Sequence, residues 1–249
     1  MKDYNYSTLA KYYDALELGE GGSESINKFL DGFFKKNKIK SVLDITCGTG
    51  AQAIYLHQKG YKITASDFSE EMVAIAQKKY KRLKFHQADM RTVNFGKFDA
   101  VISIFNAIGH LSKPDFKKAI KNIRENLKPK GYYIFDIFNL DFMRNGGFID
   151  HEFIDSCREM NGLKFVRFNH HKLDSKKSIM KFNQKTYIQE GHNSPKSFRE
   201  RWDLQIYTSS QLKEILERNG FEVVKFLNID GRKFDKKKSL FILTIARKK

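Results

Sequence analysis

The stretch Val42-Leu43-Asp44-Ile45-Thr46-Cys47-Gly48-Thr49-Gly50 decides the fold, because it joins a short apolar strand to a helix through a glycine loop. We expect the strand over Ile39–Thr46 and the helix over Ala51–Lys59. Glycines in such a loop allow a tight turn and let a ligand approach the positively polarised N-terminus of the helix. The stretch therefore predicts a ligand site at the first strand–helix turn of an α/β sheet.

Strand and helix signals keep alternating up to Asn139. Further strands are expected over Lys62–Ser66, Leu83–Gln87, Phe98–Phe105 and Tyr132–Phe138, and helices over Ser69–Tyr80 and Lys113–Leu127. The run Phe98–Phe105 is almost continuously apolar, which is typical of a strand buried on both faces. This alternation predicts a doubly wound, Rossmann-like parallel sheet with helices on both faces.

After Asn139 the pattern changes from alternating elements to alternating residues. Period-two stretches over Lys164–Leu173, Ser178–Gln189 and Ser197–Tyr207 predict antiparallel strands. A helix over Thr208–Asn219 and strands over Phe221–Ile229 and Leu240–Arg247 then resume the first pattern. We therefore expect a seven-stranded domain made of residues 1–139 and 208–249, with a β-rich, substrate-side insertion over residues 140–207.

Composition narrows the class of protein. The chain has 249 residues, of which 41% are hydrophobic, so it can build a core and is neither disordered nor collagen-like. No apolar run approaches the roughly 18 residues of a membrane span, and the N-terminus lacks the apolar core of a signal peptide. Two cysteines cannot form a disulfide framework. We expect a cytoplasmic protein without a membrane partner.

The net charge of +17 is consistent with an anionic partner such as nucleic acid. The lysine runs, however, fall mostly at expected helix ends and in loops, and the insertion is the least basic part of the chain per residue. We favour a solvated, lysine-rich surface, which makes a nucleic-acid partner unlikely without excluding it.

The glycine loop fits two kinds of cofactor. Gly48-Thr49-Gly50-Ala51-Gln52-Ala53 matches the G-x-G-x-x-A pattern of dinucleotide sites. Asp44, however, stands at the end of the strand and would repel a diphosphate in the mouth of the loop. A cationic cofactor would instead be stabilised by a few kcal/mol at an effective dielectric constant of about 20. This favours S-adenosylmethionine, which has a sulfonium and an ammonium group and no phosphate, over NAD.

Acidic residues follow two further strands. Asp67 ends the second strand, where a carboxylate can accept hydrogen bonds from ribose hydroxyls of either cofactor. Asp89 ends the third strand and can accept from an adenine amino group, with Met90 and Phe68 as neighbours of the adenine ring. Acids at the ends of three successive strands are a more specific signal than the glycines alone.

On these residues the chain resembles the class I S-adenosylmethionine-dependent methyltransferases, over about residues 40–140 and 209–247. The matching elements are Asp44–Gly50, Asp67-Phe68, Asp89-Met90, Phe98–Asn106 and the turn Pro129-Lys130-Gly131. One departure is Thr46, which stands where the family usually has its first loop glycine. The resemblance implies S-adenosylmethionine as the cofactor.

The N-terminal stretch from Tyr6 to Asp14 is similar to the Tyr-x-x-x-Ala-x-x-Tyr-Asp lead-in of small-molecule methyltransferases. That subgroup includes glycine-type and amino-sugar N-methyltransferases. The resemblance implies that Tyr6 and Tyr13 lie over the cofactor and face its methionine carboxylate or the acceptor.

The expected site combines these positions. His110 and Tyr13 are the catalytic candidates, and for His110 the alternative is a histidine satisfied by a loop carbonyl. Asp136 and Asn139 could touch a substrate or a metal, but without paired carboxylates nearby we expect no metal. The expected cofactor-binding residues are Tyr6, Asp44, Thr46, Cys47, Gly48, Gly50, Asp67, Phe68, Met72, Asp89, Met90, Phe105 and Asn106.

The resulting hypothesis is methyl transfer from S-adenosylmethionine to a small-molecule acceptor by in-line displacement. An amine nitrogen is favoured over a hydroxyl, mainly on the resemblance. The alternatives are an RNA or protein methyltransferase and a non-catalytic protein that binds S-adenosylmethionine. The sequence does not specify the acceptor or the oligomeric state.

Overall fold

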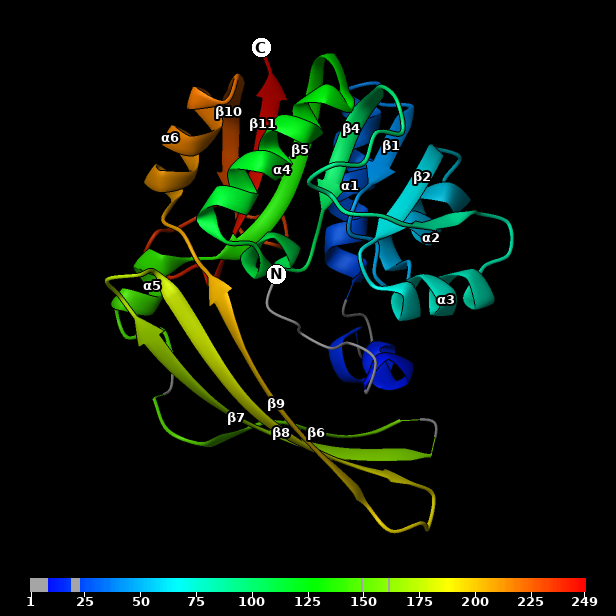
Figure 1. Cartoon of the computed structure of the whole chain (residues 1–249), viewed down its shortest axis with the longest axis vertical. Coiled ribbons are helices and arrows are strands. Elements are labelled where there is room, and N and C mark those ends of the chain that lie inside the picture. The colour runs from blue at the N-terminus through cyan, green and yellow to red at the C-terminus, as the bar shows by residue number, and fades with distance from the viewer. Residues whose placement is uncertain (1–8, 19–22, 149, 161) are drawn as a thin grey trace.

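Two β-sheets organise the chain, and the computed structural model describes residues 9–18, 23–148, 150–160 and 162–249 (Figure 1). The helices are α1 (Glu24–Lys36), α2 (Ala51–Gln58), α3 (Glu70–Lys79), α4 (Lys113–Glu125), α5 (Leu140–Arg144) and α6 (Ser209–Arg218), with short helical turns η1 (Ala10–Tyr12), η2 (Asp14–Leu18) and η3 (Ala107–His110). The strands are β1 (Ser41–Asp44), β2 (Lys62–Asp67), β3 (Phe85–Gln87), β4 (Phe98–Ser103), β5 (Leu127–Phe138), β6 (Phe153–Met160), β7 (Leu163–Asp174), β8 (Ile179–Glu190), β9 (Lys196–Gln205), β10 (Phe221–Leu227) and β11 (Phe241–Lys248).

The larger sheet has seven strands in the order β10-β11-β5-β4-β1-β2-β3. β1 pairs in parallel with β2 and β4, and the parallel pairing continues through β3 and β5. β11 is antiparallel to β5, and β10 is antiparallel to β11. The predicted doubly wound, Rossmann-like sheet is confirmed, including its closing helix and hairpin.

Helices cover both faces of this sheet (Figure 1). Leu43 and Val101 point to one face and pack with α4 and α6. Their neighbours Val42 and Ile102 point to the other face and pack with α1 and α2. Because successive side chains of a strand alternate between faces, a strand buried on both sides must be apolar throughout. This explains why the central strands are continuous apolar runs.

The smaller sheet is antiparallel, has the order β6-β7-β8-β9 and lies between β5 and α6 in the sequence. It extends away from the α/β layers (Figure 1). One end of its inner face, with Met180 and Leu204, packs against α5. The other end, with Phe165 and Ile188, packs against η1 and η2. The predicted β-rich insertion is therefore present; its limits as a separate domain stay a prediction.

One connection between the two sheets lies where the chain enters and leaves the smaller sheet. Asn139 and Tyr207 form an isolated parallel bridge, and Leu140 N donates to Tyr207 O at 2.9 Å. The Asn139 side-chain Nδ2 donates to Lys236 O at 2.9 Å and to Ser239 O at 2.8 Å. Asn139 therefore fastens the loop before β11, and its side chain has a structural role where a substrate or metal contact was considered.

Three elements were not expected from the sequence. Helix α1 buries Ile26, Leu30 and Phe34, which recur every four residues as on one face of a helix. Strand β6 is a largely exposed edge whose alternation is broken by a register shift between Ile154 and Ser156. Helix α5 is only five residues long. None of the described helices is long and apolar enough to cross a membrane.

Candidate functional site

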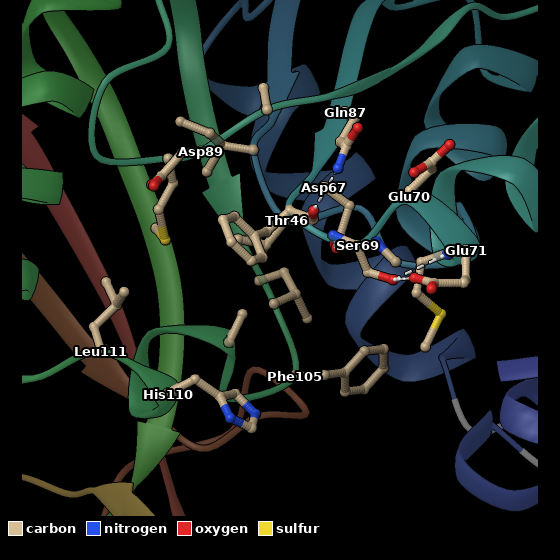
Figure 2. A pocket seen from close by; sticks show the side chains of 18 of the residues that line it. Thr46, Asp67, Ser69, Glu70, Glu71, Gln87, Asp89, Phe105, His110 and Leu111 are labelled. Atoms are coloured by element: carbon tan, nitrogen blue, oxygen red, sulfur yellow. Dashed lines mark hydrogen bonds between the residues drawn. The ribbon is translucent and has the colours of Figure 1, made fainter. Parts of the chain in front are cut away.

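A cavity of about 520 Å³ opens at the carboxyl ends of β1, β2, β3 and β4 (Figure 2). Open α/β sheets bind ligands at the carboxyl ends of their strands, at the topological switch point, where the connections from two adjacent strands run to opposite sides of the sheet. The volume of the cavity suits a small-molecule ligand. The predicted residues that line the cavity are Tyr13, Thr46, Gly48, Asp67, Phe68, Met72, Asp89, Met90, Phe105 and His110. Tyr6 lies outside the described residues.

The glycine loop connects β1 to α2 beneath the cavity. Gly48 has φ 52° and Gly50 has φ 90°, both in the left-handed region. A Cβ atom on Gly50 would also lie 3.0 Å from Ile54 Cδ1 and 3.1 Å from Phe85 Cε1. Both backbone angle and space therefore require glycine at position 50, although only Gly48 is on the cavity wall.

Asp67 ties the end of β2 to this loop. Its Oδ2 accepts from Gly48 N at 2.8 Å, and its Oδ1 accepts from Ser69 N at 2.9 Å. Burial raises the pKa of the Asp67 carboxyl, and these backbone N–H groups oppose the rise. Each carboxylate oxygen retains capacity to accept a further hydrogen bond from a ligand in the cavity.

Asp44 lies behind the loop instead of at its mouth, where the sequence placed it. Its carboxyl is only 2% exposed, and its Oδ2 has no hydrogen-bond partner among the described residues. Burial and then the Asp67 charge raise the pKa of Asp44 to about 8, against the backbone N–H groups of Thr46 and Ala53. Asp44 can therefore act on a ligand through its charge but does not line the cavity.

Cys47 is also behind the wall. Burial, followed by the charges of Asp44 and Asp67, raises the pKa of the Cys47 thiol. A thiol in this surrounding stays protonated and has little nucleophilic character. Cys47 therefore serves packing next to α2 and α3.

The ends of β2 and β3 supply an acid and two apolar side chains to this part of the site. Asp89 lines the cavity while its carboxylate accepts from Arg91 Nε at 2.9 Å, and this ion pair lowers the pKa of Asp89. Met90 is buried, whereas Phe68 is 51% exposed on the cavity wall. An exposed aromatic face beside a carboxylate provides the two kinds of contact that a purine base uses.

The turn after β4 has an unusual backbone. Phe105 and Asn106 have φ of 64° and 56°, a left-handed conformation that costs about 1–2 kcal/mol for each residue with a Cβ atom. Asp136 Oδ1 accepts from Phe105 N at 2.6 Å, and Asp136 Oδ2 accepts from Asn106 N at 3.0 Å. Asp136 is thus engaged by the backbone, where a substrate or metal contact had been considered.

Asn106 points away from the cavity. Its Oδ1 accepts from Phe138 N at 3.0 Å, so its side chain fixes β5 to the turn. Phe105, in contrast, lies on the cavity wall (Figure 2). Phe105 therefore lines the cavity, whereas the Asn106 side chain binds β5. The predicted contact of the Asn106 side chain with the cofactor does not fit this orientation.

His110 closes one side of the cavity (Figure 2). Burial lowers the pKa of His110 to about 4, so the imidazole is neutral near pH 7. A neutral ring can accept a hydrogen bond but is a weak base. Tyr13 also lines the cavity, from the segment between η1 and η2.

The N-terminal segment, residues 9–18, connects the cavity to the smaller sheet. Thr49 Oγ1 in the glycine loop donates to Asp14 Oδ1 at 2.5 Å, and Lys79 forms an ion pair with Asp14. On the other side, the Tyr12 hydroxyl donates to Glu190 of β8. The Asp14–Thr49 contact was not predicted from the sequence, although Asp14 is the last residue of the lead-in motif.

The charge of the wall is opposite to that of the chain. The acids on it are Asp67, Glu70, Glu71 and Asp89, and none of the described lining residues is Lys or Arg. In a chain of net charge +17, this leaves a local negative potential that favours a cation and disfavours a diphosphate. No group of three or more His, Cys, Asp or Glu in the described ranges could hold a metal ion.

Comparisons with known proteins agree with this geometry. Residues 42–131, which run from β1 into β5, match the family described as "Methyltransferase domain". The region from β1 to the first part of β5 is therefore similar to this methyltransferase domain. Glu70, Glu71, Gln87, Ala107 and Leu111, which sequence reasoning did not single out, all lie within the methyltransferase domain and on the cavity wall.

Relatives with curated descriptions share this domain. A putative methyltransferase of Bacillus subtilis is 33% identical over 53% of this chain and 55% of its own length. A glycine/sarcosine N-methyltransferase of Parasynechococcus marenigrum is 35% identical over 54% of this chain and 51% of its own length. The chain thus spans little more than half the length of these relatives.

The fold extends further than the sequence likeness. The crystal structure of an S-adenosylmethionine-dependent methyltransferase from Clostridium acetobutylicum superimposes with a TM-score of 0.80 at 20% identity, over 97% of this chain and 98% of that one. At this identity the likeness shows the fold, and it includes the smaller sheet as well as the methyltransferase domain.

Proposed function

We propose that the chain transfers a methyl group from S-adenosylmethionine to a small-molecule acceptor, with an amine nitrogen as the preferred nucleophile. The observation that carries the proposal is the acidic cavity wall around the glycine loop of a methyltransferase domain. Four carboxylates and no Lys or Arg among the described lining residues suit a cationic nucleoside. An NAD diphosphate would meet repulsion there.

The wall residues fit the parts of this cofactor. Asp67 would accept from ribose hydroxyls, while Asp89, Met90 and Phe68 would hold the adenine. Thr46 and Tyr13 would contact the methionine part of the cofactor. When bound, S-adenosylmethionine supplies a methyl group on a sulfonium that leaves as a neutral thioether. The chain's own task is then to align the acceptor with that methyl group, and alignment of this kind is worth about 7–11 kcal/mol.

His110 favours nitrogen over oxygen. A hydroxyl must lose its proton as it attacks, which requires a base with a pKa closer to neutral than about 4. A neutral amine already has a lone pair and needs only to be oriented. Its lone pair would face the methyl group once the cavity wall, which includes His110, has oriented the amine.

The inner face of the smaller sheet offers a surface for the acceptor. Between its apolar ends lie polar side chains that are nevertheless buried, among them Asn169, Gln184 and Thr186. Asn169 Oδ1 has no hydrogen-bond partner among the described residues. Strand β9 packs beside η3, which carries His110. We infer that this face contacts a polar acceptor, with residues 1–139 and 208–249 as the cofactor-binding domain and 140–207 as the substrate-side insertion.

A thermal-shift titration with S-adenosylhomocysteine and with NAD tests the cofactor. S-adenosylhomocysteine at 100 times its Kd should stabilise the folded state by about 2.7 kcal/mol. Asp67→Ala should abolish this shift, and Asp203→Ala, which removes an exposed carboxylate on β9, should leave it intact. A shift with NAD alone would refute the proposal.

Turnover separates the remaining alternatives. Release of S-adenosylhomocysteine should be measured over matched amines and phenols, and faster turnover of the amines is expected. Tight binding without turnover would support a non-catalytic binding protein instead. Binding of mixed RNA oligomers that weakens steeply with salt would support an RNA methyltransferase.

We also infer that the protein works in a reducing, cytoplasmic setting. Cys47 and Cys157 are both free thiols, one buried and one exposed. Secreted proteins seldom keep an exposed free thiol. Rapid loss of folded protein in oxidising buffer through Cys157, prevented by Cys157→Ser, would be consistent with this inference; expression as a stable secreted protein would contradict it.

A further inference from the structure

We propose that Asp136 is a positioning residue for the reaction: it holds the turn at residues 104–110 in the conformation that presents Phe105 and His110 to the cavity. This inference rests on the proposed function for its chemical meaning. Asp136 is not on the cavity wall, and it would act only through the turn.

The turn needs an outside partner because its backbone is in an unfavourable conformation. Phe105 and Asn106 are consecutive residues with Cβ atoms and positive φ. Their N–H groups point to the two oxygens of Asp136 at 2.6 and 3.0 Å. One carboxylate therefore receives both donors, and each donor would lose its partner if the turn relaxed to the usual backbone angles.

A second set of contacts restricts the turn from the other side. Asn106 Oδ1 accepts from Phe138 N at 3.0 Å, so two positions of β5, residues 136 and 138, hold the same turn. Gly109 leaves no room for adjustment, since a Cβ atom there would lie 2.8 Å from Asn106 Nδ2. The turn is thus hydrogen-bonded to β5 at two residues, and the Asn106 side chain occupies the space next to Gly109.

The residues that this arrangement places belong to the cavity. Phe105, Ala107, His110 and Leu111 are all on its wall and all follow β4 in this turn. Asp136 itself is fully buried, and burial raises its pKa to about 7. The hydrogen bonds described for this buried carboxylate both go to the turn, so it stabilises the backbone that carries the wall residues.

Asp99 provides a matched control at the opposite end of β4. Its Oδ2 accepts from Lys40 N at 3.0 Å and from Ser41 N at 2.8 Å, so it too is a carboxylate that receives two backbone donors. It is remote from the cavity wall. A purely structural loss should therefore be reproduced by Asp99→Asn, and a loss of positioning should not.

The experiment compares wild type, Asp136→Asn, Asp99→Asn and Gly109→Ala. Calorimetry with S-adenosylhomocysteine gives the affinity, thermal unfolding gives the stability, and nuclear magnetic resonance of the His110 imidazole reports its surroundings without any ligand. Asp136→Asn should weaken binding about tenfold and shift the His110 signals, because it removes a charged acceptor that holds both N–H groups of the turn. Asp99→Asn should leave both unchanged.

Gly109→Ala displaces Asn106 from within the turn, so it should reproduce the binding loss and the His110 shift even where Asp136→Asn fails to fold. The inference is overturned if a folded Asp136→Asn, or a folded Gly109→Ala, binds S-adenosylhomocysteine within twofold of wild type with unshifted His110 signals. A wild type that binds no S-adenosylhomocysteine refutes the proposed function, while the His110 signals still test the positioning.

Discussion

The two sheets of this protein place their polar groups in different ways. In the seven-stranded sheet two buried acids stand near the carboxyl ends of strands: Asp44 is the last residue of β1, and Asp136 lies two residues before the end of β5. In the four-stranded sheet the buried polar groups stand in mid-strand, as Asn169 and Gln184 do. The first arrangement makes a site at the edge of a sheet, and the second makes one on its face.

This difference follows from how each sheet is covered. Both faces of the larger sheet are packed by helices, so ligands reach only its edge. The inner face of the smaller sheet packs against α5 at one end and against η1 and η2 at the other, and the polar side chains between these ends are also buried. The cofactor part of the molecule is therefore fixed by an apolar core, whereas the smaller sheet buries polar side chains among its apolar ones.

The largest expected contrast between the sheets is in stability. Phe135 in β5 is fully buried and lies 4.5 Å from the Tyr133 ring centroid. Phe135→Ala should lower the free energy of unfolding by about 3–5 kcal/mol, since it leaves a cavity in the core. Ile154→Ala, at a position 63% exposed in the smaller sheet, should change it by no more than about 0.5 kcal/mol. Urea titration would measure both, and similar losses would contradict the comparison.

A second contrast concerns pH and lies in the larger sheet. Because the pKa of Asp44 is about 8, its carboxyl is mostly protonated at pH 7, and a cationic ligand must favour loss of that proton. The affinity for S-adenosylmethionine should therefore rise with pH by up to about tenfold per unit below pH 8 and level off above it. Without ligand the sign is reversed, since ionisation of Asp44 destabilises the fold as the pH rises from about 4 to 8.

S-adenosylhomocysteine is the control ligand for this dependence, because it lacks the sulfonium charge and should show a shallower slope. Asp44→Asn should remove the difference in slope between the two ligands. Calorimetry at pH 6, 7 and 8 measures both, and equal slopes in wild type would argue against a charge effect of Asp44.

A smaller effect is expected where the N-terminal segment joins the two sheets. Asp14→Ala removes the hydrogen bond from Thr49 in the glycine loop and should weaken S-adenosylhomocysteine binding about two- to tenfold, in line with a net hydrogen-bond contribution of about 0.5–1.5 kcal/mol. Lys11→Ala, on the same segment, removes an ion pair with Glu190 of β8 and a cation–π contact with Tyr12, neither of which involves the glycine loop, and should leave the affinity unchanged. Equal losses of affinity in the two variants would show that the effect comes from the whole N-terminal segment and not from the Asp14–Thr49 hydrogen bond.

The smallest effect is expected at the exposed thiol. Cys157 in β6 is exposed, whereas burial and two nearby acids keep the Cys47 thiol protonated. A thiol reagent should therefore modify Cys157 first and leave the affinity for S-adenosylhomocysteine unchanged. Rapid modification of Cys47 in the folded protein would show that the glycine loop is more open than the structure indicates.

The strands of the larger sheet could be predicted from the sequence because most of them are recognisable from their own residues alone. An apolar run bounded by turn residues identifies a doubly buried strand without knowledge of its neighbours, and the strand-end acids then lie together by topology. Helix α1 was not predicted, although Ile26, Leu30 and Phe34 have the spacing of one helical face. Strand β6 was missed because an exposed edge has little apolar periodicity to detect.

The limits of the site prediction have a physical origin as well. Which side of a turn a residue occupies depends on partners from distant strands, and sequence spacing contains no such information. Asn106 and Phe105 are neighbours, yet Phe138 draws one away from the cavity that the other lines. Likewise, Asp44 sits at the predicted strand end, but the packing of the glycine loop over it decides that its carboxyl is covered.

The bridge between Asn139 and Tyr207 also bears on the history of the chain. A segment whose first and last residues are hydrogen-bonded neighbours can be exchanged for another of different length without disturbing the strands on either side. Residues 140–206 could thus be exchanged as one segment, and a graft at these two positions that keeps the contacts of Tyr12 and Glu17 would test whether the segment determines the acceptor.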